Sequence, residues 1–163
     1  MTDTKATLRF GLAVAAIVLV LDQVSKLALI DLLRANPGGI EVAPFFNLVQ
    51  VWNRGVSFGM LGGEWFGNYQ RWILTMLAIA VSALLGFWLS KAERPIDRLA
   101  LGLVIGGALG NAIDRVAYGA VADFFDFHVA GWHWPAFNIA DSAIVVGVAL
   151  LLIDGFRPSR GTA

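Results

Sequence analysis

Residues 10–30 read FGLAVAAIVLVLDQVSKLALI, an apolar run interrupted by Asp22 and Lys26. A helix of about 20 residues can cross the ~30 Å hydrocarbon core of a bilayer. An isolated span must be helical, because in lipid it has to satisfy its own backbone hydrogen bonds. The run is long, and no clean small-x-small cleavage site follows it, so it is not a removable signal peptide. It predicts a permanent membrane-spanning helix.

Three further apolar stretches are long enough to cross a bilayer, at about residues 72–89, 99–116 and 137–153. Hydrophobic residues make up 58% of the 163 residues and charged residues 15%. Soluble domains average roughly 45–50% apolar and about 25% charged residues, and a small soluble domain could not bury this much apolar surface. We therefore predict a single all-α integral membrane domain over residues 1–163, with four transmembrane helices.

The balance of charges and the lack of cysteine exclude several other classes. Twelve basic residues cancel twelve acidic ones, so there is no positive excess to bind nucleic acid. The absence of cysteine excludes a disulfide scaffold, a thiolate zinc site and a cysteine nucleophile.

Lysine and arginine are distributed unevenly over the connections. Both terminal segments and the short connection at residues 91–98 carry seven of them, whereas the longer first and third connections carry four. Positive residues concentrate in cytoplasmic loops. Both termini should be cytoplasmic, and the two longer loops should lie on the outer face.

The outer loops carry structural signals of their own. Residues Ile40–Trp52 partly alternate β-branched and aromatic residues, and Pro44 breaks the run, which predicts two short strands or one bent strand. Residues Phe58–Tyr69 mix glycine with aromatic residues, which favours a short helix on the membrane surface. Residues 121–126 hold Asp123 and Asp126 among aromatic residues, in what we expect to be a loop returning to the membrane.

Several polar residues lie at or near membrane depth, where burying a charge is costly. Asp22 and Lys26 are one helical turn apart and predict an internal ion pair. Gly106 and Gly110 form a small-xxx-small face for close helix packing. The following segment contains Asn111, Asp114 and Arg115. For Asp114 and Arg115, a structural network at a helix end and contact with substrate are equally good interpretations. Asn53, with Gly55 two residues later, indicates a tight turn.

Asn138 and Asp141 open the fourth span, and helix capping accounts for one of them but not for both. Two carboxyl groups at a water-accessible boundary can share a proton, so that one activates water while the other polarises a carbonyl group. Spacing alone leaves Asp114, Asp123 and Asp126 open as the partner of Asp141. This chemistry needs no metal or cofactor, and we expect neither.

Other catalytic chemistries have weak support in the sequence. His128 and His133 fall in one loop beside tryptophans, as expected of residues at the membrane interface. They lack the spacing of helical metal ligands, and no serine lies in a recognisable nucleophile turn.

Five segments in order resemble the motifs of the lipoprotein signal peptidase family (signal peptidase II). They cover nearly the whole chain and are the following: DQVSK at 22–26, NRGVSF at 53–58, GGALGNAIDR at 106–115, VADF at 121–124 and FNIADS at 137–142. Each alone is weak, but five in order with matching hydropathy between them are specific. Arg54 and Val56 depart mildly from the small residues that the family commonly has there.

The resemblance implies a bacterial inner-membrane aspartic endopeptidase with its active site at the outer face and a small extracytoplasmic β-cradle. Such an enzyme cuts diacylglyceryl-modified prolipoproteins on the N-terminal side of the lipidated cysteine. We expect it to act as a monomer in membrane lipid. By position, the implied roles are as follows: catalysis by Asp123 and Asp141; substrate binding by Asn53, Asn111, Arg115 and Asn138; and support by Asp22, Lys26 and Asp114, the last buttressing Arg115.

Two non-catalytic alternatives fit the sequence less well. A four-helix transporter or channel subunit with proton-relay acids would carry polar residues on both sides of the midplane, whereas most of these acids cluster at the outer ends of the spans. A structural assembly protein that packs partners through Gly106 and Gly110 would leave Asp123 and Asp141 unexplained.

The charge distribution makes a prediction about topology. A reporter fused near Glu93 should be active only in its cytoplasmic form, because the segment from Lys91 to Arg98 carries three positive charges in a short connection. Activity of an exported reporter at this position would overturn the orientation.

Overall fold

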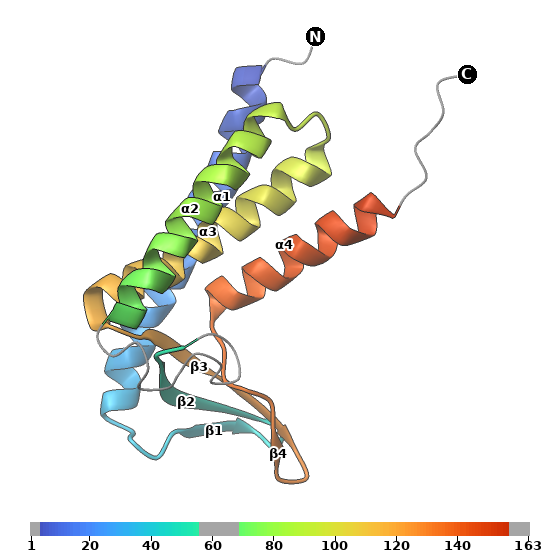
Figure 1. The fold of residues 1–163 in the computed structure, drawn as a ribbon. Coiled ribbons are helices and arrows are strands. Elements are labelled where there is room, and N and C mark those ends of the chain that lie inside the picture. The colour runs from blue at the N-terminus through green and yellow to red at the C-terminus, as the bar shows by residue number, and fades with distance from the viewer. Residues whose placement is uncertain (1–3, 56–68, 157–163) are drawn as a thin grey trace.

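The computed structural model describes residues 4–55 and 69–156 and shows a mostly helical protein with a small sheet (Figure 1). The elements, in chain order, are α1 (Thr4–Arg34), β1 (Ile40–Ala43), β2 (Phe46–Asn53), α2 (Gln70–Lys91), α3 (Pro95–Tyr118), β3 (Val121–Val129), β4 (Trp132–His133) and α4 (Ile139–Gly155). The predicted surface helix at Phe58–Tyr69 falls, except for Tyr69, outside the described residues.

Helix α3 lies at the centre of the bundle and packs against α1, α2 and α4. It begins at Pro95, a residue that suits the first turn of a helix because its missing N–H would have no helical partner there. It ends at Tyr118 and is capped by Gly119, whose φ of 78° is a left-handed conformation that favours glycine. Leu89, Leu101 and Ile105 form part of the buried apolar core between the helices.

Small residues on α3 allow its neighbours to approach closely, as the small-xxx-small face predicts. A Cβ atom at Gly106 would lie 2.6 Å from the Ala15 carbonyl oxygen of α1. A Cβ atom at Gly110 would lie 2.6 Å from Asp22 Oδ2. These positions therefore need glycine, and Gly110 also makes room for a buried carboxylate.

Three helices among the described residues are long and apolar enough to cross a membrane. They are Leu8–Arg34, Gln70–Lys91 and Pro95–Tyr118. Large apolar side chains such as Ile17, Leu84 and Val145 lie on the outside of the bundle, where lipid can cover them. Helix α4 has 17 residues, so it is about 25 Å long at a rise of 1.5 Å per residue.

The four strands form one antiparallel arrangement in the order β1-β2-β3-β4. Strands β1 and β2 lie on either side of Pro44, so the prediction of two short strands at Ile40–Trp52 is confirmed. The predicted loop at residues 121–126 is wrong, because these residues belong to strand β3. Phe124 is fully buried there, although two acidic residues obscure the strand pattern in the sequence.

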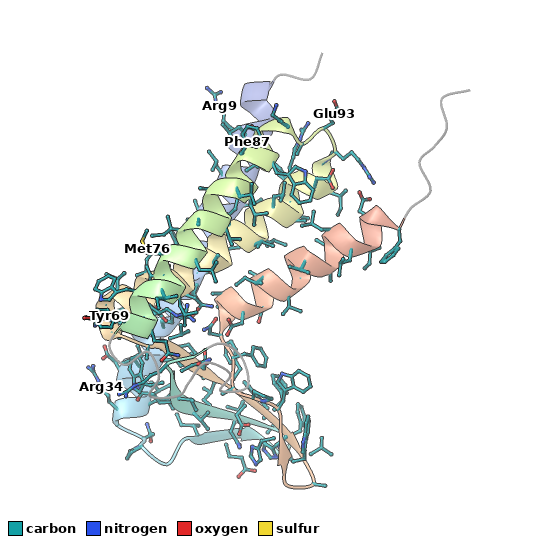
Figure 2. All side chains as sticks on the ribbon, viewed as in Figure 1. Arg9, Arg34, Tyr69, Met76, Phe87 and Glu93 are labelled. Atoms are coloured by element: carbon teal, nitrogen blue, oxygen red, sulfur yellow. The ribbon has the colours of Figure 1, made fainter. Side chains whose placement is uncertain are left out.

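The sheet packs against the C-terminal end of α1 through Ile30, Leu33, Ala122 and Phe124. Figure 1 shows the sheet at one end of the bundle, with the first residues of α1 and the last residues of α4 at the other. In Figure 2, Arg34 and Tyr69 lie toward the sheet, whereas Arg9 and Glu93 lie at the far end.

The segment before α4 is bound to β3 by backbone hydrogen bonds. The Phe125 N–H donates to the Phe137 carbonyl group at 2.9 Å, and the Phe137 N–H donates back at 3.2 Å. Since Asn138 follows Phe137 directly and Asp123 lies two residues before Phe125, this bridge brings the start of α4 beside the first half of β3.

The close packing of α3 and α4 can be tested at Gly107. A Cβ atom there would lie 2.4 Å from the Ala140 carbonyl oxygen and 2.8 Å from Ile144 Cγ1. Gly107→Ala should lower the free energy of unfolding by ~1–3 kcal/mol through overpacking. Gly86→Ala is the matched control, because nothing lies within 4 Å of its added methyl group. Equal unfolding temperatures for the two variants in detergent would contradict this packing.

Candidate active site

Asp123 and Asp141 come from different elements and meet through Asn138. Asp123 is the third residue of β3, and Asp141 lies in the first turn of α4. The Asn138 side-chain amide donates to Asp123 Oδ1 at 2.8 Å, and its backbone N–H donates to Asp141 Oδ2 at 3.3 Å. One residue thus contacts both carboxyl groups.

Asp123 is enclosed by strand pairing as well as by Asn138. Strand β2 pairs with β3 so that Val51 lies opposite Asp123 and Asn53 opposite Val121. The Asn53 amide donates to Asp123 Oδ2 at 3.1 Å. Asp123 is only 1% exposed, and both of its oxygens accept hydrogen bonds.

Asp141 is held by the capping of its own helix. The Asn138 side chain accepts from the Asp141 N–H, while the Asp141 carboxyl group accepts from the Asn138 N–H. This is a capping box, in which each residue satisfies an N–H at the start of the helix. Capping therefore uses both residues, contrary to our expectation that it would account for one. Asp141 Oδ1 is left to accept from the Asn111 amide at 2.7 Å.

Three asparagine amides are oriented so that their NH2 groups face the two carboxyl groups. The side-chain oxygen of Asn53 accepts from the Gly55 N–H at 3.0 Å, that of Asn138 from the Asp141 N–H at 2.9 Å, and that of Asn111 from Lys26 Nζ at 3.2 Å. Because a backbone N–H and an ammonium group can only donate, each oxygen end is fixed.

Arg115 connects α3 to the end of β2. Its guanidinium group donates to the Asn111 carbonyl group at 3.3 Å and to the Gly55 carbonyl group at 3.2 Å. Its Nε is buried and has no hydrogen-bond partner in the described part of the chain. Arg115 thus has a donor for another group at this site.

A buried charged cluster lies directly behind the asparagines. Lys26 Nζ is 2.8 Å from Asp22 Oδ2 and 2.8 Å from Asp114 Oδ2, and all three side chains are almost fully buried. The predicted ion pair of Asp22 and Lys26 is therefore present. Asp114 contacts Lys26, Gln23 and the Ala122 N–H. The support of Arg115 by Asp114, which the family resemblance implies, stays a prediction.

A cleft of about 780 Å³ leads to this site. Its apolar walls come from α2, α3 and α4 and include Leu77, Val81 and Val145. At its polar end lie Asn53, Asn111, Arg115 and Asp141. A long apolar ligand could therefore lie along the helices while a polar group reaches Asp141.

The electrostatic environment favours a protonated carboxyl group at Asp123. Burial and the neighbouring Asp141 carboxylate raise the pKa of Asp123 from 3.8 to about 7, although Asn53 and Asn138 partly oppose this shift. Burial disfavours an ionised acid, and a second negative charge nearby disfavours it further. The pair can therefore share a proton near neutral pH.

Asp114 and Asp126, the other candidate partners of Asp141, have different surroundings. The Asp114 carboxylate forms a buried ion pair with Lys26. Asp126 is buried between the Asn47 amide at 3.1 Å and His133 Nδ1 at 2.8 Å. Burial raises the pKa of Asp126, but the hydrogen bonds to His133 and Asn47 and the nearby charge of the two imidazoles together lower it below its usual value. Asp126 is thus not a solvated loop acid but joins β2 to the β3–β4 hairpin.

Sequence reasoning missed the roles of Gln23, Asn47 and His133. Gln23 was detectable in principle as a third polar residue at membrane depth. Its amide donates to Asp22, to Asp114 and to the Gly110 carbonyl group at 3.1–3.3 Å. Asn47 and His133 gain their roles through pairing across the sheet, which spacing along the chain does not reveal. Within residues 4–55 and 69–156, no group of three metal-ligating side chains is found.

Comparisons with known proteins agree on one family. The family model described as signal peptidase (SPase) II matches residues 14–157. The chain is 47% identical to a lipoprotein signal peptidase of Aeromonas hydrophila over 98% of this chain and 95% of that protein. It is 49% identical to a lipoprotein signal peptidase of Methylobacterium sp. strain 4-46, over 94% and 93% of the two chains.

Solved structures give the same result for the fold. A bacterial membrane enzyme solved by the in meso method at 2.3 Å resolution is similar with a TM-score of 0.75 and 30% identity. The similarity covers 94% of this chain and 93% of that enzyme.

The raised pKa of Asp123 predicts a pH-dependent stability difference. Its carboxyl group binds a proton more tightly in the folded state, so its contribution to stability is present below about pH 4 and is lost as the pH rises through about 7. Asp123→Asn removes this titration. The unfolding temperature of the variant relative to wild type should therefore rise between pH 5 and pH 8. If the difference in unfolding temperature between Asp123→Asn and wild type stays constant from pH 5 to pH 8, the raised pKa of Asp123 is contradicted.

Proposed function

The chain belongs to the signal peptidase II family, and we propose that Asp123 and Asp141 are its catalytic dyad. The protein is a lipoprotein signal peptidase, an endopeptidase that removes signal peptides from diacylglyceryl-modified prolipoproteins. It cuts on the N-terminal side of the lipidated cysteine.

One observation carries the assignment of the dyad. Asn138 donates to both Asp123 and Asp141 at the polar end of the cleft. Asp141 lines this cleft, and the more deeply buried Asp123 lies behind it. The dyad thus combines one carboxyl group within reach of substrate with another whose surroundings favour a proton.

The proposed reaction requires one ionised and one protonated carboxyl group. The ionised group takes a proton from water as the water oxygen attacks the scissile carbonyl carbon, and the protonated group donates to the carbonyl oxygen. When the tetrahedral intermediate collapses, the C–N bond breaks and a proton passes to the leaving amine of the lipidated cysteine. A pKa of about 7 for Asp123 suits this exchange near neutral pH.

The amide groups and Arg115 supply the fixed donors around this reaction. Asn53, Asn111 and Asn138 already donate to the dyad carboxyl groups, so they hold these groups in place when substrate enters. Arg115 has a buried Nε without a partner among the described residues, and we assign it to a carbonyl group of the substrate backbone.

We further propose that residues 1–163 form a single integral membrane domain with four membrane spans. Helix α4 is short, but it is attached to α3 near both of its ends. Asn111 donates to Asp141 at the sheet end, and Arg94 pairs with Asp154 at the other end. Since α3 is long enough to cross a membrane, α4 passes through most of the same layer.

We propose that the dyad lies at the outer face of the bacterial inner membrane, with both termini cytoplasmic. Arg9 and Glu93 lie at the end of the bundle away from the sheet (Figure 2), which agrees with the concentration of positive charge at that end. The cleft and the dyad belong to one chain, which supports a monomer working in membrane lipid.

Replacing either dyad residue should abolish cleavage. Asp123→Asn and Asp141→Asn keep the shape of the side chain but can neither accept a proton from water nor donate an acidic one. Each should lower kcat by ~10²–10⁴-fold or more in an assay of a diacylglyceryl-modified prolipoprotein in detergent. Binding of the lipidated substrate should persist.

Asp31→Asn is the matched control. Asp31 lies near the C-terminal end of α1, and its side chain is 78% exposed in an ion pair with Arg34, so this variant should cleave at the wild-type rate. Undiminished cleavage by folded Asp141→Asn would refute the aspartic mechanism.

A further inference from the structure

The Lys26 ammonium group uses all three of its hydrogens inside the protein. It contacts Asp22 and Asp114 at 2.8 Å each and donates to Asn111 Oδ1 at 3.2 Å. Lys26 is 1% exposed, and both aspartates are 0% exposed. A lysine ammonium group has three donors, so Lys26 is saturated by one chain and has no hydrogen left for substrate.

Besides Lys26, the Asp22 and Asp114 carboxylates each contact a backbone N–H group close to the dyad. Asp22 Oδ1 accepts from the Ala140 N–H at 3.0 Å, and Asp114 Oδ2 accepts from the Ala122 N–H at 3.1 Å. Ala140 directly precedes Asp141, and Ala122 directly precedes Asp123. Each carboxylate therefore binds the peptide N–H next to one member of the dyad.

We propose that Asp22, Lys26 and Asp114 form a positioning triad that sets the relative position of the two catalytic carboxyl groups. This inference rests on the assignment of Asp123 and Asp141 as the dyad. The triad connects the backbone of β3 to that of α4 through a single ammonium group on α1. None of its three residues reaches the reacting atoms.

The electrostatics of a buried triad make this connection stiff. Opposite charges attract more strongly where the effective dielectric constant is low, and a buried ion pair is stable only when its geometry and hydrogen bonds are complete. The two carboxylates are drawn to the same nitrogen, so neither can move away without leaving a buried charge unpaired. The peptide groups that they bind are restrained with them.

Two further contacts extend the restraint. The third hydrogen of Lys26 fixes the oxygen end of Asn111, whose NH2 group donates to Asp141. Gln23 donates to Asp22 and to Asp114, which adds a neutral bridge between the carboxylates. Misplacing a reacting group by about 1 Å can lower a rate ~10²-fold, so this restraint has a direct catalytic consequence.

A triple variant separates positioning from stability. Asp22→Asn/Lys26→Met/Asp114→Asn removes all three charges together, leaves no unpaired ion, and keeps an amide oxygen able to accept each alanine N–H. Replacing a buried ionic cluster by neutral groups is often compatible with folding. We expect the folded variant to bind diacylglyceryl-modified prolipoprotein with KM within about threefold of wild type and to show kcat lowered at least about tenfold.

The control is a second ion-pair variant at the opposite end of the bundle. Arg94→Gln/Asp154→Asn removes the pair that joins the α2–α3 connection to α4, and its kcat should stay within about twofold of wild type. A folded triple variant with wild-type kcat, measured beside inactive Asp123→Asn and Asp141→Asn, overturns the positioning triad and leaves the dyad intact. Activity in those two dyad variants would instead overturn the proposed function.

Backbone substitution keeps the proposal testable if the triple variant does not fold. Lactic acid incorporated in place of Ala122 or Ala140 replaces one peptide N–H by an ester oxygen and keeps the methyl side chain. Each ester should lower kcat at least about tenfold with little change in KM. Lactic acid at Ala149, an exposed residue in the middle of α4, is the control and should leave kcat within about twofold. Wild-type kcat in both site esters would overturn the proposal.

Discussion

Lys26 is buried between Asp22 and Asp114 where α1 meets α3, and its charge is compensated entirely within the protein. All three side chains are almost fully buried, so neither lipid nor bulk water can replace a lost partner, and the three charges must be satisfied by one another. Gly110 is needed because a side chain there would collide with Asp22. The close packing of the helices and the polar site are therefore consequences of one requirement.

The need to satisfy buried polar groups also explains how Asp123 on β3 and Asp141 on α4 are held close to each other. Asp123 comes from β3, Asp141 from α4, and Asn138 contacts both while it caps α4. Turn and capping geometry, which usually serve only the backbone, here also orient the amides of Asn53 and Asn138 toward the carboxyl groups. A helix cap at Asn138 and a turn at Asn53 therefore also hold the two carboxyl groups of the proposed dyad.

Patterns within short stretches of sequence predicted a helix, an ion pair and a break between two strands. Residues 10–30 predicted a spanning helix, the spacing of Asp22 and Lys26 predicted their ion pair, and Pro44 predicted the break between β1 and β2. Strand β3 escaped prediction because Asp123 and Asp126 interrupt its apolar pattern, and their burial depends on Asn53, Asn138 and His133 from distant segments. For the same reason, spacing left three partners for Asp141, and the family resemblance was needed to choose Asp123.

In the proposed mechanism, Asp123 and Asp141 work as a coupled pair with one shared proton. The most direct test is kcat/KM for a diacylglyceryl-modified prolipoprotein as a function of pH in detergent. A dyad that shares one proton should give a bell-shaped profile whose limbs belong to the pair, because both the fully protonated and the fully ionised dyad are inactive. With the pKa of Asp123 at about 7, the alkaline limb should begin near neutral pH. A rate that keeps rising through pH 9 would contradict the shared proton.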